Sequence, residues 1–589
     1  MTRKKIFIIF ALLALCLTCC FALTACKKCK HANTHEQTVT QADCDSAGSV
    51  NIICDDCGVT VETKTVNALG HTYGDWNVTL SPTVYADGEM QRVCGRNAKH
   101  IESKPIPKLE QGGDYTVTVT EQPDCTKKGK LTYQSSVYGT YEVDIPAELH
   151  TYDDEREGYC KVCGNKYYSV GLDYELSADG QYYTVKLGSC EENSIAIPHS
   201  YKNLPVKAIG SEAFAYRTWI KSIVIPEYVE TIGSGAFNGS GITKVTFNAI
   251  NCADFNQKNW VFLVNTKVEL TIGCRVERIP ARMFYPLVTQ DRTVNLAKIT
   301  FEDDSVCRSI GDSAFNKTSV GSLILPDSLE TIGANAFYNT DITALVLGNN
   351  VTSIGSSAFG ACGRLVSVTF GRALSKIGDD AFNYCSKLVS VDLSKTRVKS
   401  IGDDAFKGCS AVQFVNLPDT LESIGKQAFV DCSAMTALNL GNGVKTIGEQ
   451  AFANCVKLTS LTVPASVTSI ANSAFANAET LAQIEFNAVN CADFQSGNNV
   501  FANAAKDVDL TVTFGDTVKH IPARLFYATS DASKIASIKT LTLGKNVSSI
   551  GDYAFFGVQI TQASFGGSSE TWRQVTIGSG NSALISLVK

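Results

Sequence analysis

The sequence has no excess of charge of either sign, and it lacks the motifs that most enzymes carry. Its 589 residues include 52 Lys and Arg against 58 Asp and Glu, a formal net charge of −6 at pH 7. Proteins that follow a phosphate backbone carry basic patches, so nucleic acid is not expected as a partner. The sequence contains no GxxxxGKS/T phosphate loop, no HExxH metal motif and no GxSxG nucleophile turn. We therefore do not expect an enzyme.

Histidine and long apolar runs are also scarce. Beyond residue 168 the chain has two histidines, His199 and His520, and neither stands beside a Ser or Cys nucleophile motif. A bilayer span needs roughly 18 consecutive apolar residues. The chain has one such stretch, Ile6 to Ala25, at its N-terminus.

This N-terminal stretch has the pattern of a secreted lipoprotein. Basic residues at positions 3–5 precede it, and small residues lead up to Cys26, which is typical of a secretory signal. The tetrapeptide Leu-Thr-Ala-Cys that ends at Cys26 resembles the bacterial lipobox, whose Cys is lipidated. We predict a signal peptide over 1–25, lipidation of Cys26, and a membrane-anchored protein outside the cytoplasm. The alternative is an ordinary signal peptide or a membrane anchor with an incidental Cys.

From residue 209 to the end, one phrase recurs: Ile-Gly-x-x-Ala-Phe, a few small residues, then an alternating apolar run. Between Phe315 and Phe475 its Phe returns every 22 to 24 residues. Such a period indicates a solenoid, in which each coil buries its apolar face against its neighbours. Two longer gaps each hold a Val-Phe pair near the middle, at Phe262 and Phe501, so we count two degenerate coils there and about fifteen coils in all.

Each part of the coil has its own expected structure. The alternating run predicts one short parallel strand with one buried face. The Ile-Gly pair predicts a core residue followed by a tight turn, in which Gly permits a positive φ. The stretch around Ala-Phe is too short for a stable α-helix and predicts one helical or 3₁₀ turn, with Phe in the core.

The extended phrase Ile-Gly-x-x-Ala-Phe-x-x-Cys-x-x-Leu-x-x-Val-x-Leu-Pro resembles the repeat of BspA-like leucine-rich repeat proteins. Residues 171–185 and 572–577 resemble that family's first and last coils. The resemblance covers about residues 170–589, and we place the solenoid domain at 169–589. It implies a right-handed α/β-type leucine-rich repeat solenoid on the bacterial cell surface, with a role in adhesion.

One set of strand residues is expected to point outward, and this set is small, polar and rich in hydroxyls. Its one aromatic residue is Phe414. Aromatic anchors dominate many interfaces, so we predict that Phe414, Asn416, Asn439 and Thr462 bind an extracellular or cell-surface protein. Binding of carbohydrate or cell wall remains an alternative, although stacking aromatics are scarce. Loops near 286–295 and 528–537 are rival contact sites.

A column of cysteines runs through the solenoid, three residues after the repeat Phe. Its members are Cys362, Cys385, Cys409, Cys432 and Cys455. Equivalent positions elsewhere hold Ser, Thr or Ala, so the position requires a small side chain. We predict inert, buried thiols rather than a metal or catalytic ladder, and we expect a Ser at such a position to bury a hydroxyl without an assured partner.

Residues 26–168 are predicted to form Cys/His-rich small repeats that are zinc-ribbon-like or act as a spacer. They resemble Cys/His repeats found beside such solenoids, and a Cys-x-x-Cys-Gly turn with a distant Cys and His suits a structural zinc ion. The two predicted ligand sets are Cys44, Cys54, Cys57 with His71, and Cys125, His150, Cys160 with Cys163.

The sequence does not settle which residues belong to each ligand set. His31 or His35 is an alternative to His71. The middle copy, which contains Cys94, is degenerate because Asn97 stands where a second Cys is expected, so we do not expect Cys94 to be a ligand. Disulfides, favoured outside the cell, and reduced thiols are the alternatives to zinc.

The anchor prediction can be tested with Cys26→Ala. Because Cys26 precedes both predicted domains, the variant should leave the membrane fraction without unfolding. Detergent phase separation measures the partitioning, with the unmodified chain as reference. Full retention of the variant in the detergent phase would contradict lipidation.

Overall fold

The structure is a computed structural model. It describes residues 33–66, 68, 70–80, 82, 87–106, 116–123, 127–135, 139–145, 168–256, 260–264, 266–285, 295–506, 508–527 and 537–588. The predicted signal peptide, Cys26, nearly all of both predicted loops, and Cys125, His150, Cys160 and Cys163 lie outside the described residues. The chain divides into two compact units, one up to Tyr168 together with Ser200–Pro205 and the other comprising the remainder.

The first unit contains three antiparallel sheets of three strands each, and each sheet follows the chain order. The first sheet comprises β1 (Thr34–Thr40), β2 (Gly48–Cys54) and β3 (Thr60–Val66). The second comprises β4 (Asn77–Leu80), β5 (Gly88–Cys94) and β6 (Asn97–Ile106), and the third β7 (Thr116–Glu121), β8 (Gly129–Ser135) and β9 (Gly139–Ile145).

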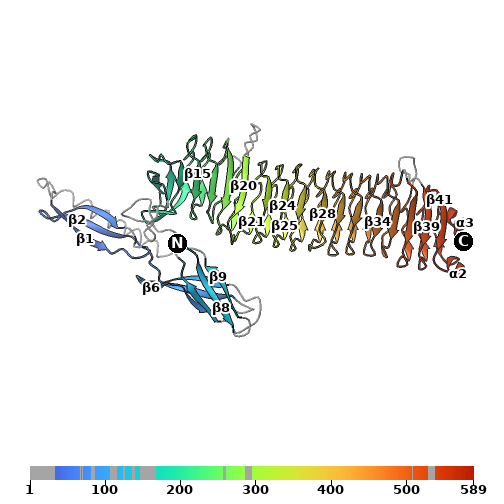
Figure 1. Ribbon diagram of the computed structural model, residues 1–589, viewed down its shortest axis with the longest axis horizontal. Helices are drawn as coiled ribbons and strands as arrows, with labels where there is room; N and C mark the ends of the chain where they lie inside the picture. The colour runs from blue at the N-terminus through green and yellow to red at the C-terminus, as the bar shows by residue number, and fades with distance from the viewer. Residues whose placement is uncertain are drawn as a thin grey trace, which may run out of the picture. The chain divides into compact units, whose positions relative to one another are not determined.

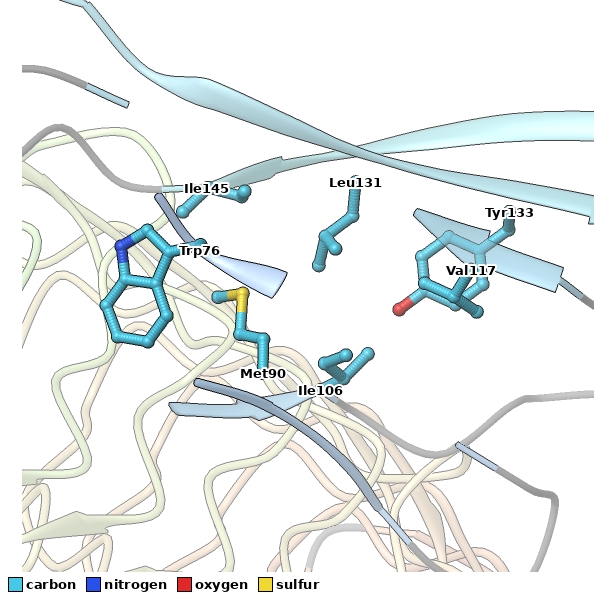
Figure 2. Close-up of a cluster of buried hydrophobic side chains, with 7 residues drawn as sticks. All are labelled: Trp76, Met90, Ile106, Val117, Leu131, Tyr133 and Ile145. Carbon is cyan, nitrogen blue, oxygen red and sulfur yellow. The ribbon is translucent and has the colours of Figure 1, made fainter. Parts of the chain in front are cut away.

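The second and third sheets share one apolar core. Figure 2 shows its seven side chains, which come from both sheets and from the segment before β4. They are Trp76, Met90, Ile106, Val117, Leu131, Tyr133 and Ile145. The first sheet contributes nothing to this cluster, and β1 and β3 are exposed along their whole length.

The second unit is the solenoid (Figure 1). Its main ladder comprises, within the described residues, sixteen strands that follow one another along the chain as four successive parallel sheets. They are β12 (Ser194–Ala196), β15 (Ser222–Ile225), β17 (Lys244–Phe247), β18 (Lys267–Ile272), β20 (Asn295–Phe301), β22 (Ser322–Ile324), β24 (Ala344–Val346), β26 (Ser367–Thr369), β28 (Ser390–Asp392), β30 (Phe414–Asn416), β32 (Ala437–Asn439), β34 (Ser460–Val463), β36 (Gln483–Phe486), β37 (Leu510–Phe514), β39 (Ile538–Leu543) and β41 (Ile560–Phe565). The predicted solenoid of short parallel strands is confirmed.

A second parallel ladder passes through the Ile that opens the repeat phrase. From the sequence, only a turn is expected at this position. Its two-residue strands are β16 (Thr231–Ile232), β19 (Arg278–Ile279), β21 (Ser309–Ile310), β23 (Thr331–Ile332), β25 (Ser353–Ile354), β27 (Lys376–Ile377), β29 (Ser400–Ile401), β31 (Ser423–Ile424), β33 (Thr446–Ile447), β35 (Ser469–Ile470), β38 (His520–Ile521), β40 (Ser549–Ile550) and β42 (Thr576–Ile577). Most coils therefore have two sheet faces, but the degenerate coils of Phe262 and Phe501 have no such strand among the described residues, and this ladder is interrupted there.

The solenoid begins and ends with less regular elements. Before the ladders lie β10 (Asp173–Leu176), β11 (Tyr183–Lys186), β13 (Ser200–Tyr201) and β14 (Leu204–Ile209). Two short helices close the chain, α2 (Ser569–Trp572) and α3 (Ser582–Leu587). None of the helices in the described residues has the length and hydropathy of a membrane span.

The glycine of the Ile-Gly pair is explained by close approach rather than by a positive φ. Gly355 and Gly425 do not have positive φ values. A Cβ on Gly425 would lie 2.6 Å from the backbone carbon of Gly402 in the preceding coil, closer than atoms can pack. The left-handed conformation falls instead on residues such as Ser357 (φ 53) and Ala361 (φ 56).

The segment around the repeat Phe forms turns, not the expected helical or 3₁₀ turn. Alternate backbone N–H groups bond to the next coil: Phe359 N–H donates to the Ala381 carbonyl at 2.8 Å, and Ala361 N–H donates to the Asn383 carbonyl at 2.7 Å. The Ala358 and Gly360 N–H groups between them bond within the turn. Because these bonds already satisfy the buried N–H groups, no helix is needed.

The repeat phenylalanines form one continuous stack inside the solenoid. Neighbouring ring centroids are 4.7 Å apart at the closest pair and 5.9 Å at the widest. The stack comprises Phe214, Phe237, Phe262, Phe284, Phe315, Phe337, Phe359, Phe382, Phe406, Phe429, Phe452, Phe475, Phe501, Phe526 and Phe555. Phe262 and Phe501 lie in this stack, so the two degenerate coils are confirmed.

The cysteine column is fully buried beside this stack, as predicted. Burial raises the pKa of the Cys409 and Cys432 thiols, which keeps them protonated and unreactive. Cys409 Sγ donates to the Phe382 carbonyl of the preceding coil at 3.2 Å. Hydroxyls at equivalent positions differ, since Thr318 donates to the carbonyl of the Phe in its own coil, whereas the buried Ser240 hydroxyl has no partner among the described residues. A hydroxyl at this position therefore has no assured partner, as expected.

We predict that Phe406→Ala destabilises the solenoid by about 3–5 kcal/mol, because it opens a cavity in the stack. The matched control is Phe414→Ala, whose ring is exposed and whose loss should cost less than about 0.5 kcal/mol. Urea denaturation followed by far-UV circular dichroism measures both variants. Equal destabilisation would show that the stack is not the main source of stability.

We also predict that Cys409→Ser costs about 1 kcal/mol and no more than Cys409→Ala, because the Phe382 carbonyl remains available as an acceptor for the serine hydroxyl. The same denaturation experiment measures both substitutions. A serine variant clearly less stable than the alanine variant would mean that the acceptor is not used.

Candidate functional site

The predicted binding residues occupy adjacent positions on the main ladder. We call its outward residues the strand face, which here includes Phe414 and Asn416 of β30, Asn439 of β32 and Thr462 of β34. Asn416 pairs in register with Asn439, and Phe414 with Ala437. Phe414 is 53% exposed, so its ring projects above a small neighbour.

A ladder of amide side chains runs beside Phe414. Asn416 Nδ2 donates to Asp392 Oδ1 at 3.2 Å, and Asn439 Nδ2 donates to Asn416 Oδ1 at 2.8 Å. Hydrogen bonds from Ser394 and then from Asn416 lower the pKa of Asp392 despite its partial burial. The ladder therefore carries an ionised carboxylate and holds its amides in fixed orientations.

Two further exposed apolar residues lie in the two coils before Phe414, where they align with Gln413, the residue that precedes Phe414. They are not among the binding residues predicted from the sequence. Val366 and Val389 occupy the positions just before β26 and β28 and bond in successive coils, Val389 N–H to the Val366 carbonyl at 3.1 Å. Both are exposed. From the sequence, exposed and buried residues are expected to alternate along each strand. Val366 and Val389 do not fit this alternation, because each is followed directly by another exposed residue. We call Val366, Val389 and Phe414 the apolar patch.

His520 lies between a serine and an aspartate. Its Nδ1 is 2.8 Å from Ser549 Oγ, and its Nε2 is 2.9 Å from Asp493 Oδ1. Burial would raise the pKa of Asp493, but bonds from a backbone N–H and from His520 lower it. The order of groups matches that of a serine hydrolase triad. The sequence alone does not reveal this arrangement, because the three residues lie 27 and 29 positions apart.

The related segment of the solenoid shows that this arrangement links coils. There Arg278 occupies the place of His520 and bonds to Asp254, the counterpart of Asp493. Both aspartates also accept a backbone N–H three residues after the basic residue, at 2.7 Å in each case. Arg cannot act as a base, so the feature common to both segments is structural, and we assign His520 the same role.

A candidate metal centre lies between the first and second sheets. Cys44, in the β1–β2 loop, and Cys94, at the end of β5, have Sγ atoms 3.8 Å apart. A ring nitrogen of His71 lies within 4.8 Å of both sulfurs. Both thiols are buried, Cys94 with 2% exposure. Soft sulfur and imidazole donors of this kind suit zinc.

A second group of ligand atoms adjoins the first through His71. Its members are Asp45, His71 and His100. Asp45 lies 2.9 Å from His71 Nε2 through one oxygen and 3.1 Å from His100 Nε2 through the other. The Nδ1 atom of His100 is buried and makes no hydrogen bond within the described residues.

The environment of Cys94 favours the thiolate. Burial would raise its pKa, but hydrogen bonds from the backbone at Thr72, from His71, and from the backbone at Arg96 and Asn97 lower it to about 6. The thiolate is the form that binds metals. The pKa of Cys44 is raised, first by burial and then by its neighbour Cys94.

Of the first predicted zinc set, the structure brings together Cys44 and His71. Cys54 and Cys57 belong to neither ligand group of the described residues. Cys94, which we did not expect to be a ligand, takes their place. The prediction combined Cys44 and His71 with the Cys-x-x-Cys turn of the same repeat copy, Cys54–Cys57. The structure instead combines them with Cys94, which begins the corresponding turn of the second copy.

Comparison with known proteins identifies the repeat. The model of the BspA type leucine rich repeat region matches residues 187–305, 291–413, 399–533 and 511–577, with six copies of the model. No curated protein matches the chain.

Three solved structures illustrate the similarity. A leucine rich cell surface protein from Faecalibacterium prausnitzii A2-165 is 19% identical with a TM-score of 0.29, covering 73% of this chain and 98% of its own. A leucine-rich repeat protein from Bacteroides ovatus is 20% identical with a TM-score of 0.33, covering 67% and 86%. The pneumococcal vaccine antigen PcpA is 17% identical with a TM-score of 0.30, covering 72% and 96%.

Proposed function

Because the chain belongs to the BspA-type leucine-rich repeat family, we propose that it is a bacterial cell-surface protein that binds a protein partner through the strand face. The observation that carries the proposal is the apolar patch, in which Phe414 stands 53% exposed on a rigid ladder. Aromatic side chains on rigid surfaces are frequent hot spots of protein interfaces.

The surroundings of the patch support a protein rather than a sugar as ligand. Val366 and Val389 add aliphatic surface, and the Asp392–Asn416–Asn439 ladder offers polar groups whose orientations are already set. Pre-ordered groups lose little conformational freedom on binding. Carbohydrate or cell-wall binding is the second candidate, since the rest of the face is rich in hydroxyls.

The proposal includes no catalysis. The Asp493–His520–Ser549 triplet, which has the order of a catalytic triad, has a counterpart with arginine in place of histidine. Solenoids of this kind use their extended faces for recognition.

The proposal also covers the cellular location of the protein and its attachment to the membrane. We infer that Cys26 is lipidated before signal cleavage, becomes the first residue of the mature protein and holds it on the outer side of the membrane. The three N-terminal sheets then act as a spacer that carries the solenoid. A structural zinc ion belongs to this spacer, supported by the two groups of metal-ligating atoms between its first two sheets.

We predict that Phe414→Ala lowers the affinity for the protein partner by about 30-fold, or about 2 kcal/mol. The purified chain is tested against immobilised extracellular-matrix proteins and, in parallel, against a glycan array. The matched control is Ile585→Ala, an exposed apolar residue in α3, which should bind like the unmodified chain.

Three results decide between the candidates. Saturable binding to a matrix protein that falls in the Phe414 variant alone supports the strand face. Binding to glycans without binding to proteins would transfer the function to the carbohydrate alternative. Protein binding that is unchanged by Phe414→Ala would place the contact elsewhere on the solenoid.

A further inference from the structure

The first N-terminal sheet lacks the apolar face that a three-stranded sheet needs for stability. Its β1 and β3 strands are exposed throughout. The buried residues of this sheet and its β1–β2 loop are Cys44, Gly48, Ile52 and Cys54, and none of them belongs to the core shared by the second and third sheets. Small domains of this kind are usually stabilised by a disulfide or a metal ion.

The thiols at the junction of the first and second sheets have the separation of two ligands on one ion. Two thiolates on a tetrahedral zinc ion lie about 3.8 Å apart, since each Zn–S bond is about 2.3 Å long. The Sγ atoms of Cys44 and Cys94 are 3.8 Å apart. A ring nitrogen of His71 within 4.8 Å of both sulfurs supplies a third donor.

The carboxylate of Asp45 fits the usual environment of a metal-bound histidine. Such histidines generally donate their second ring nitrogen to a carboxylate, which fixes the orientation of the ring. His71 Nε2 lies 2.9 Å from Asp45, and the other oxygen of Asp45 lies 3.1 Å from His100 Nε2. His100 retains a buried Nδ1 without a hydrogen bond in the described part of the chain, but His100 is grouped with Asp45 and His71 and not with the two sulfurs.

The backbone brings these side chains together from two sheets. Gly70 N–H donates to the Cys44 carbonyl at 3.1 Å, Gly95 N–H donates to the Thr72 carbonyl at 2.7 Å, and Tyr73 forms a bridge with Cys94. The segment that carries His71 is therefore held against both the Cys44 loop and the turn after Cys94. An ion at this point would join elements that share no apolar core.

We propose that Cys44, His71 and Cys94 bind one zinc ion, and that this ion fastens the first sheet to the second. The assignment rests on the proposed zinc-containing spacer and names its ligands. Asp45 acts as a positioning residue that orients His71. Binding releases the thiol protons, so the site is occupied only when both sulfurs are deprotonated.

The test uses the full chain, purified without chelator, and measures bound zinc by mass spectrometry of the metal. Cys44→Ser and Cys94→Ser should each remove one equivalent, and the double variant should remove no more than either single variant. Cys274→Ser, at a partly exposed cysteine of the solenoid, is the matched control and should keep all the zinc. Asp45→Asn should keep the stoichiometry but weaken zinc binding by about 10–100-fold.

A second set of variants distinguishes the question of which residues bind zinc from the question of whether zinc is bound at all. If Cys57→Ser removes this equivalent of zinc and Cys94→Ser keeps it, the ligands are those of the set predicted from the sequence and the assignment is wrong. Zinc retained in both the Cys44 and the Cys94 variants would also overturn the assignment, while leaving a zinc-containing spacer in place. Absence of zinc from the unmodified chain, or a Cys44–Cys94 disulfide in peptide mapping, would overturn both. None of these outcomes bears on binding through Phe414.

Discussion

The solenoid depends on one constraint: a coil can bury its Phe ring and satisfy its backbone only against its neighbours. The Phe359 N–H bonds to the Ala381 carbonyl of the next coil, and the Phe359 ring stacks on Phe382 at 5.3 Å. Two strand ladders and the ladder of turn bonds follow the same rule. Even the Ile-Gly glycine follows from it, because the backbone of the preceding coil leaves no room for a Cβ.

Stacking identical coils also places equivalent side chains in columns, and a column can resemble a functional site. The Asp493–His520–Ser549 row has the order of a catalytic triad, yet Arg278 and Asp254 form the same link elsewhere in the solenoid. The cysteine column is buried and bonded to Phe carbonyls, which suits packing rather than chemistry. Positions that depart from their column are more informative. Phe414 stands between Ser390 and Ala437, where a small side chain would suffice for the fold.

The N-terminal sheets are built on a different principle. The second and third sheets share an apolar core around Trp76, whereas the first has exposed outer strands and is linked to the second through Cys44, His71 and Cys94. Such a division suits a spacer, in which rigid modules follow one another and each junction needs its own stabilisation. The solenoid needs no such device, since every coil provides the core of the next.

The sequence by itself determined the solenoid, its period and its two degenerate coils, because a fixed spacing of Phe permits only one way to bury the rings. It also determined the inert cysteine column and the outward position of Phe414. Only the tertiary structure decided features that depend on neighbouring coils or sheets. These are the second strand ladder, the close approach at Gly425, the exposure of Val366 and Val389, and the partnership of Cys44 with Cys94. The physical reason is that local spacing specifies which side chains are buried, whereas contacts between residues 50 positions apart depend on how the copies pack.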